Sequence, residues 1–183
     1  NGSAYWDYVK SFMGELDANK TIKSSDEKAV IATGNHEYMN GQYDQFANDA
    51  TRQRIKYGVE GREGSNYRIY LLGTASDATW NQYTQAQVTK LTDYLNSVDD
   101  SKPIFVLTHF PLHQFDSRTI TNAKLVIDAL NAAVRDNHQT IVLLWGHNHS
   151  VSDENYDQIF QPGDTIEYAK TSGSTATIEF LYA

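Results

Sequence analysis

Apolar runs that end at a histidine constrain this chain more than any other feature. Three short runs have the length of buried strands: residues 29–33, 104–107 and 141–145. A histidine follows each run within a few residues: His36, His109, and the pair His147 and His149. Because helical patterns separate the runs, the sequence predicts an α/β fold. The carboxyl ends of parallel strands lie along one edge of a sheet, so we expect these histidines to converge.

Two segments between the runs are strongly amphipathic. Residues 84–98 and 122–135 carry apolar residues at the three-and-four spacing of a helix with one buried face. In the first segment, the predicted buried stripe is Val88, Leu91, Leu95 and Val98. The remaining segments are predicted as helices at 4–16 and 42–57, a glycine-rich loop at 58–64, a strand at 66–72 and a terminal hairpin within 166–182.

Composition narrows the class of protein. The 183 residues fit one domain or the C-terminal portion of a larger one, spanning 1–183, and are enough to bury a core. A net charge of −8 argues against nucleic-acid binding through a basic patch. The absence of cysteine excludes disulfides and thiolate metal sites, and no apolar run has the length of a membrane span. The Tyr- and Asn-rich composition suggests a bacterial protein, with cytoplasm and cell surface both open.

Histidines at strand ends suggest a metal site, because neutral imidazole nitrogens are good ligands for divalent metals. Each motif alone has a plainer interpretation. His147 and His149 could be polar loop residues, and Gly34-Asn35 could form a tight turn with a helix cap. Together, however, four of the six histidines follow strands, which packing alone does not readily explain.

Three blocks, taken together, resemble the calcineurin-like metallophosphoesterase superfamily. They are Gly34-Asn35-His36-Glu37, His109-Phe110-Pro111-Leu112 and Gly146-His147-Asn148-His149. Their order and approximate spacing fit, and the resemblance runs from near the start to about residue 150. It implies a four-layer α/β/β/α sandwich that hydrolyses phosphate esters with two divalent transition-metal ions. Nitrogen and oxygen ligands without sulfur suit manganese, iron or zinc.

The resemblance also implies a role for individual residues. Asn35, His109 and His147 look like ligands of one metal, and His149 looks like a ligand of the other. His36 looks like the histidine that contacts the phosphate and protonates the leaving group. Two ions roughly 3.5–4 Å apart can clamp the phosphoryl oxygens during in-line attack.

Two further residues are candidates for a supporting role: Glu37 in the first block and His113 just after the second. Glu37 is expected to orient His36 or its loop. His113 either lines the substrate pocket or is an ordinary histidine of a surface loop, and the second interpretation is the simpler one.

The chain departs from the family pattern at its beginning. The Asp-x-His and Gly-Asp blocks of the family have no counterpart, while Asn1-Gly2 resembles the residues that follow the second of them. We therefore expect these 183 residues alone to hold at most one metal ion, weakly, and to hydrolyse phosphate esters poorly or not at all. The alternative is a non-catalytic module that binds phosphate or a partner. An Asp-x-His and a Gly-Asp preceding Asn1 in the parent protein would favour the enzyme.

Overall fold

The computed structural model describes a core of sheet and helices and some isolated positions. Described residues are 8, 11, 15, 31, 32, 34, 35, 55, 56, 59–63, 66–73, 81–99, 101–113, 120–147, 165–167 and 175–183. Residues 8, 11 and 15 are helical, as the predicted helix at 4–16 requires. Tyr8, expected on the apolar face of that helix, is 77% exposed.

The main sheet has five strands in the order β3-β4-β5-β6-β9. They are β3 (Val59–Glu63), β4 (Arg68–Leu72), β5 (Ile104–Thr108), β6 (Ile141–Leu144) and β9 (Leu181–Tyr182). Strands β4, β5, β6 and β9 run parallel, and β3 is antiparallel to β4. The predicted α/β class is confirmed at this level.

Among the residues that the structure describes, two smaller strand pairs lie outside the main sheet, and one isolated β-bridge joins Gln82 to Thr121. The parallel pair is β1 (Ile31–Ala32) with β2 (Ile55–Lys56). The antiparallel pair is β7 (Thr165–Glu167) with β8 (Thr175–Thr177). Neither pair is hydrogen-bonded into the main sheet within the described residues.

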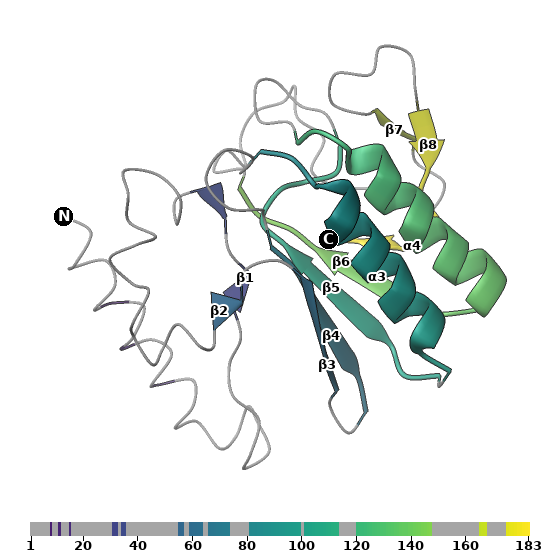
Figure 1. Cartoon of the computed structure of the whole chain (residues 1–183), viewed down its shortest axis with the longest axis horizontal. Helices are drawn as coiled ribbons and strands as arrows, with labels where there is room; N and C mark the ends of the chain where they lie inside the picture. The colour runs from purple at the N-terminus through teal and green to yellow at the C-terminus, as the bar shows by residue number, and fades with distance from the viewer. Residues whose placement is uncertain are drawn as a thin grey trace.

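Helices α3 (Gln85–Ser97) and α4 (Ala123–Asn137) connect the parallel strands and lie side by side against the sheet (Figure 1). Thr84 begins α3 with a capping box, because its hydroxyl accepts from the Gln87 N–H at 3.3 Å and the Gln87 side chain accepts from the Thr84 N–H at 2.9 Å. All four residues of the predicted α3 stripe are buried. Both predicted helices are therefore confirmed, with bounds shifted by one or two residues.

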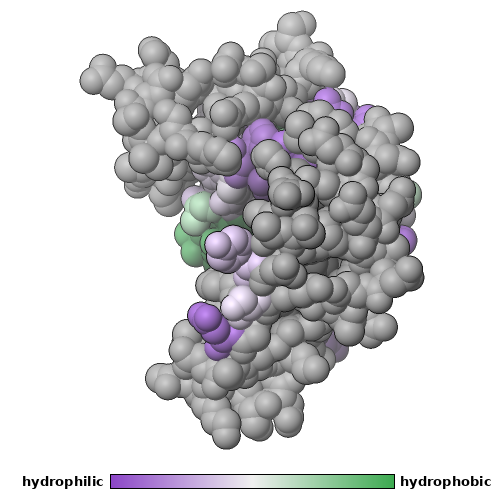
Figure 2. All heavy atoms as spheres, turned by 90° about the vertical axis from the view of Figure 1, so that its left-hand side faces the viewer, coloured by the Kyte–Doolittle hydropathy of each residue, from purple (hydrophilic) through white to green (hydrophobic). Residues whose placement is uncertain are grey.

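The core lies between the helices and one face of the sheet. Ile104 and Val106 of β5 and Leu143 of β6 have no exposed surface and belong to the same apolar cluster as α3 and α4. The residues between them face the other way and are less buried, up to Leu144 at 38% exposure. In Figure 2, which turns the left-hand side of Figure 1 toward the viewer, hydrophobic and hydrophilic described residues lie beside one another.

Three sequence predictions need correction. The predicted helix at 42–57 cannot extend to its expected end, because Ile55–Lys56 is strand β2. Within the predicted loop at 58–64, residues Val59–Glu63 form strand β3, the first strand in the order of the main sheet. Only β7 and β8 pair in the predicted terminal hairpin, whereas Leu181–Tyr182 joins the main sheet beside β6.

No helix in the described part of the chain is long and apolar enough to span a membrane.

Candidate metal centre

Asn35, His109 and His147 come together in space although long stretches of sequence separate them. The Nε2 atom of His109 lies 2.8 Å from Oδ1 of Asn35 and 3.0 Å from Nδ1 of His147. The two imidazole rings meet edge to face, with centroids 4.9 Å apart. The structure thus brings together the three side chains that the sequence analysis assigned to one metal.

The sheet explains why the two histidines meet. His109 directly follows β5, and His147 lies three residues after the end of β6. These strands are parallel neighbours, with Ile104 beside Ile141, so both chains leave the sheet at the same edge. The Gly146 N–H then donates to the His109 carbonyl at 3.1 Å, which joins the two loops directly.

Gly34 allows Asn35 to approach the ring of His109. A Cβ atom at Gly34 would lie 2.5 Å from Cδ2 and 2.6 Å from Nδ1 of His109, well inside normal contact distance. Glycine is required at this position for space and not for backbone conformation, since the φ angle of Gly34 lies outside the left-handed region. Any side chain at this position would collide with the imidazole of His109.

His147 has a backbone conformation that is unusual for a residue with a side chain. Its φ angle is 73°, and the other described non-glycine residues with positive φ are Asn122 and His138. Those two flank α4, where left-handed residues commonly end helices. His147 does not flank a helix of the described residues, and residues held in sparsely populated conformations are concentrated at functional sites.

One proton cannot satisfy both contacts of His109. A neutral imidazole nitrogen carries either one hydrogen or one lone pair. With a hydrogen, Nε2 donates fully to only one of its two neighbours; without it, Nε2 accepts from His147 and faces the lone pairs of the Asn35 oxygen. Reversing the Asn35 amide makes its NH2 group compete with His147 for a single lone pair.

The donor atoms fit a divalent cation by chemistry and by spacing. Two imidazole nitrogens and an amide oxygen are ligands that manganese, iron and zinc accept. Neighbouring ligands about 2.1 Å from an ion lie roughly 3.0 Å apart in an octahedral site and roughly 3.4 Å apart in a tetrahedral site. The observed 2.8 and 3.0 Å are closer to the octahedral value. No three histidine, cysteine, aspartate or glutamate side chains gather within the described residues. The third donor atom beside the two imidazoles is the amide oxygen of Asn35.

A buried hydrogen bond also holds the end of strand β5, the residue directly before His109. Thr108 at the end of β5 is hydrogen-bonded through its hydroxyl to the phenol of Tyr83, which is fully buried. Burial raises the pKa of Tyr83 well above its ordinary value, and the bond to Thr108 lowers it by less. The phenol therefore stays protonated and able to hydrogen-bond at any physiological pH.

His113 is not a surface residue. Its side chain is 7% exposed, and its ring packs edge to face against Trp145 and Tyr182. The interpretation as an ordinary histidine of a surface loop is therefore wrong. The predicted site residues His36, Glu37 and His149 lie outside the described residues.

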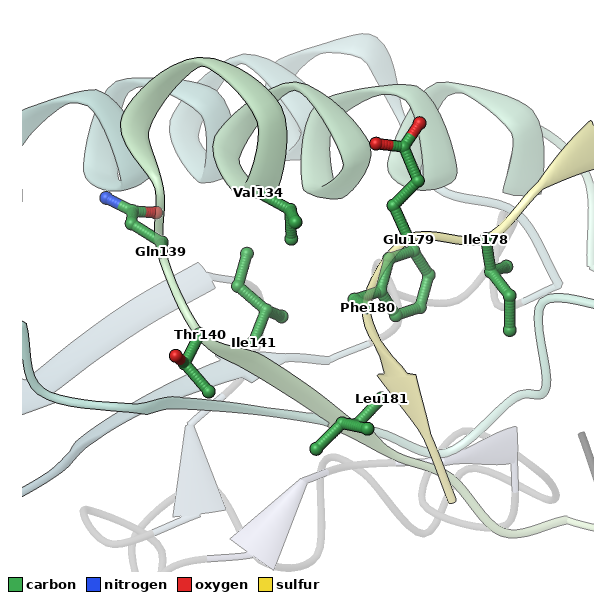
Figure 3. A pocket seen from close by; sticks show the side chains of 8 residues that line it. All are labelled: Val134, Gln139, Thr140, Ile141, Ile178, Glu179, Phe180 and Leu181. Atoms are coloured by element: carbon green, nitrogen blue, oxygen red, sulfur yellow. The ribbon is translucent and has the colours of Figure 1, made fainter. Parts of the chain in front are cut away.

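A separate pocket of about 270 Å³ lies elsewhere on the sheet (Figure 3). Its lining residues are Val134, Gln139, Thr140, Ile141, Ile178, Glu179, Phe180 and Leu181. Gln139 and Thr140 precede β6, so this pocket is at the amino end of the strand whose carboxyl end leads to His147. The carboxylate that lines the pocket belongs to Glu179 and pairs with Arg135 at 3.4 Å. No histidine is among the lining residues. The pocket is therefore distinct from the cluster of Asn35, His109 and His147.

Searches with the whole chain find no match among protein-family models, curated proteins or solved structures.

Proposed function

We propose that the chain carries one half of a dinuclear metal site that hydrolyses phosphate esters. The contacts of His109 with Asn35 and His147 are the main support, because three metal-compatible atoms converge where one proton cannot satisfy them. The resemblance of the three histidine blocks to calcineurin-like metallophosphoesterases supplies the reaction. The four-layer α/β/β/α sandwich is part of the same proposal.

In this proposal, Oδ1 of Asn35, Nε2 of His109 and Nδ1 of His147 hold one divalent ion. When bound, such ions act as Lewis acids that polarise the phosphoryl group and lower the pKa of a water molecule. Gly34 keeps the approach to His109 open, and Thr108 and Gly146 fix the backbone on either side of it.

The remaining roles come from the resemblance. His149 would belong to the second ion, and His36 would contact the phosphate and donate a proton to the leaving oxygen. Glu37 would orient the loop that carries His36. The ligands described here account for one ion, so metal binding is a more direct test than turnover.

Calorimetric titration of manganese and zinc into the full chain tests the site. We expect at most one ion per chain, with affinity lowered more than about 100-fold in His109→Ala and His147→Ala, since even changes around a ligand cost 10- to 100-fold. The control is His138→Asn, an exposed histidine in a left-handed conformation that asparagine tolerates. Absence of binding by the wild-type chain, or equal affinities in all three variants, would show that these residues are not a metal site.

Hydrolysis of p-nitrophenyl phosphate is the second readout. Any metal-dependent turnover should disappear in His109→Ala and His147→Ala and persist in His138→Asn. Binding of metal and inorganic phosphate without turnover, in a longer chain that includes the residues preceding Asn1, would instead favour the non-catalytic module.

A further inference from the structure

Tyr182 lies near the C-terminus, and its hydroxyl contacts the loop that begins at His109. It lies 2.6 Å from the backbone nitrogen of Leu112, 3.3 Å from that of His113 and 2.9 Å from Nδ1 of the His113 ring. Tyr182 belongs to β9 and is 9% exposed. A single buried phenol therefore makes three hydrogen bonds to one short loop.

The direction of these three bonds follows from the donors available. The backbone N–H groups of Leu112 and His113 can only donate, so the phenol oxygen accepts from both. With both lone pairs of the oxygen engaged, the hydrogen of the hydroxyl can be donated to Nδ1 of His113. Burial raises the pKa of Tyr182 far above its ordinary value, more than the two backbone hydrogen bonds lower it. The hydroxyl therefore remains protonated.

The C-terminal residue Ala183 also contacts the segment that leads to His147, another candidate metal ligand. Ala183 donates its N–H to the Leu143 carbonyl at 2.9 Å and accepts from the Trp145 N–H at 2.9 Å. Trp145 lies two residues before His147, and its ring stacks on Tyr182 with centroids 5.7 Å apart. The last two residues of the chain thus contact both segments: Tyr182 reaches the loop after β5 through its side chain, and Ala183 bonds to Leu143 and Trp145 through its backbone.

We infer that Tyr182 is a positioning residue for the candidate metal centre: its hydroxyl fixes the loop after β5 so that His109 stands within reach of Asn35 and His147. The effect on metal binding rests on the proposed function, whereas the effect on the loop does not. Tyr182 touches no ligand atom in the described contacts and acts through the backbone of Leu112 and His113.

Tyr182→Phe removes the hydroxyl and keeps the ring that packs against Trp145. Tyr70→Phe is the matched control, because Tyr70 is 2% exposed in the same sheet and its hydroxyl has no hydrogen-bond partner among the described residues. Leu112 and His113 would lose a buried acceptor, so we expect their amide hydrogens to exchange at least about tenfold faster in Tyr182→Phe only. Metal affinity should fall about 10- to 100-fold in the same variant, as for other residues that support a ligand.

The two readouts separate the two proposals. If the wild-type chain binds no manganese or zinc, the proposed function fails, and exchange at Leu112 and His113 together with the imidazole ¹⁵N shifts of His109 in the metal-free chain still decides the inference. Unchanged exchange and unchanged His109 shifts in Tyr182→Phe would overturn it.

If Tyr182→Phe does not fold, a milder change at the same position provides the test. Site-specific 3-fluorotyrosine at position 182 keeps the hydroxyl and weakens its oxygen as an acceptor. We then expect a smaller but selective acceleration of exchange at Leu112 and His113, and equal exchange in the wild-type and fluorinated chains would equally overturn the inference.

Discussion

Gly34→Ala should displace His109 and weaken the candidate metal centre. The new methyl group would lie 2.5 Å from Cδ2 of His109, whereas carbon atoms in contact normally lie about 3.5–4.0 Å apart, so the ring must retreat by roughly 1 Å. A shift of that size breaks the contacts of 2.8 and 3.0 Å to Asn35 and His147. Overpacking at a buried position such as this typically costs about 1–3 kcal/mol of stability.

Gly146→Ala is the matched control, because it adds the same methyl group in the loop beside His109. Its nearest atom among the described residues would be the His109 carbonyl oxygen at 3.9 Å, an ordinary contact distance. Alanine meets no collision there with the described residues and restricts the unfolded chain, so we expect stability to stay equal or to rise by up to about 1 kcal/mol.

Urea unfolding of the metal-free chain and titration of zinc or manganese, on both variants, measure the two consequences separately. Gly34→Ala should lower the free energy of unfolding and reduce metal affinity by about 10- to 100-fold, the range for changes that disturb the support of a ligand. Equal stability and equal affinity in the two variants would refute the reasoning, because His109 would then not depend on the space that Gly34 leaves.

Two predictions concern the fold. Asn131→Ala should cost about 1–3 kcal/mol in urea unfolding, because this buried side chain donates to the Thr177 carbonyl at 2.8 Å and accepts from the Glu179 N–H at 3.0 Å. Lys124→Ala, which removes an exposed ion pair on the same helix, should change stability by less than about 1 kcal/mol, and equal losses would contradict this assignment. Burial also raises the pKa of three tyrosines in the folded chain, so stability should be complete below about pH 10 and fall as the pH rises further; a flat profile from pH 9 to 11 in urea unfolding would be inconsistent with it. These tyrosines are Tyr70, Tyr83 and Tyr182.

Local sequence patterns were sufficient for helices α3 and α4 and for strands β4, β5 and β6. The three-and-four spacing in α3 and the apolar runs of β5 and β6 report which face of each element is buried, and burial is a property of the element itself. Strand β3 was missed because its sequence, Val-Glu-Gly-Arg-Glu, lacks an apolar run. It is a strand because it pairs with β4, which no local pattern reports.

The candidate site shows the same division. Histidines after strands could be recognised from the sequence, as could Asn35 through the resemblance, and the structure brings Asn35, His109 and His147 together. Tyr83 and Tyr182 were not singled out, since a buried tyrosine in a sequence carries no sign of where its hydroxyl points. His113 was misjudged for the same reason, because its burial comes from Trp145 and Tyr182 rather than from its neighbours in the chain.

The sequence by itself determined the α/β class, the alternation of β5, α4 and β6, the buried face of α3, and the residue types available for metal binding. Only the tertiary structure decided that Gly34 must lack a side chain, that β9 lies parallel to β6, and that Tyr182 reaches Leu112 across 70 residues of chain. The physical reason is strand register. A slip of one residue turns every side chain of a strand to the opposite face, so contacts between distant segments depend on how the whole sheet is paired.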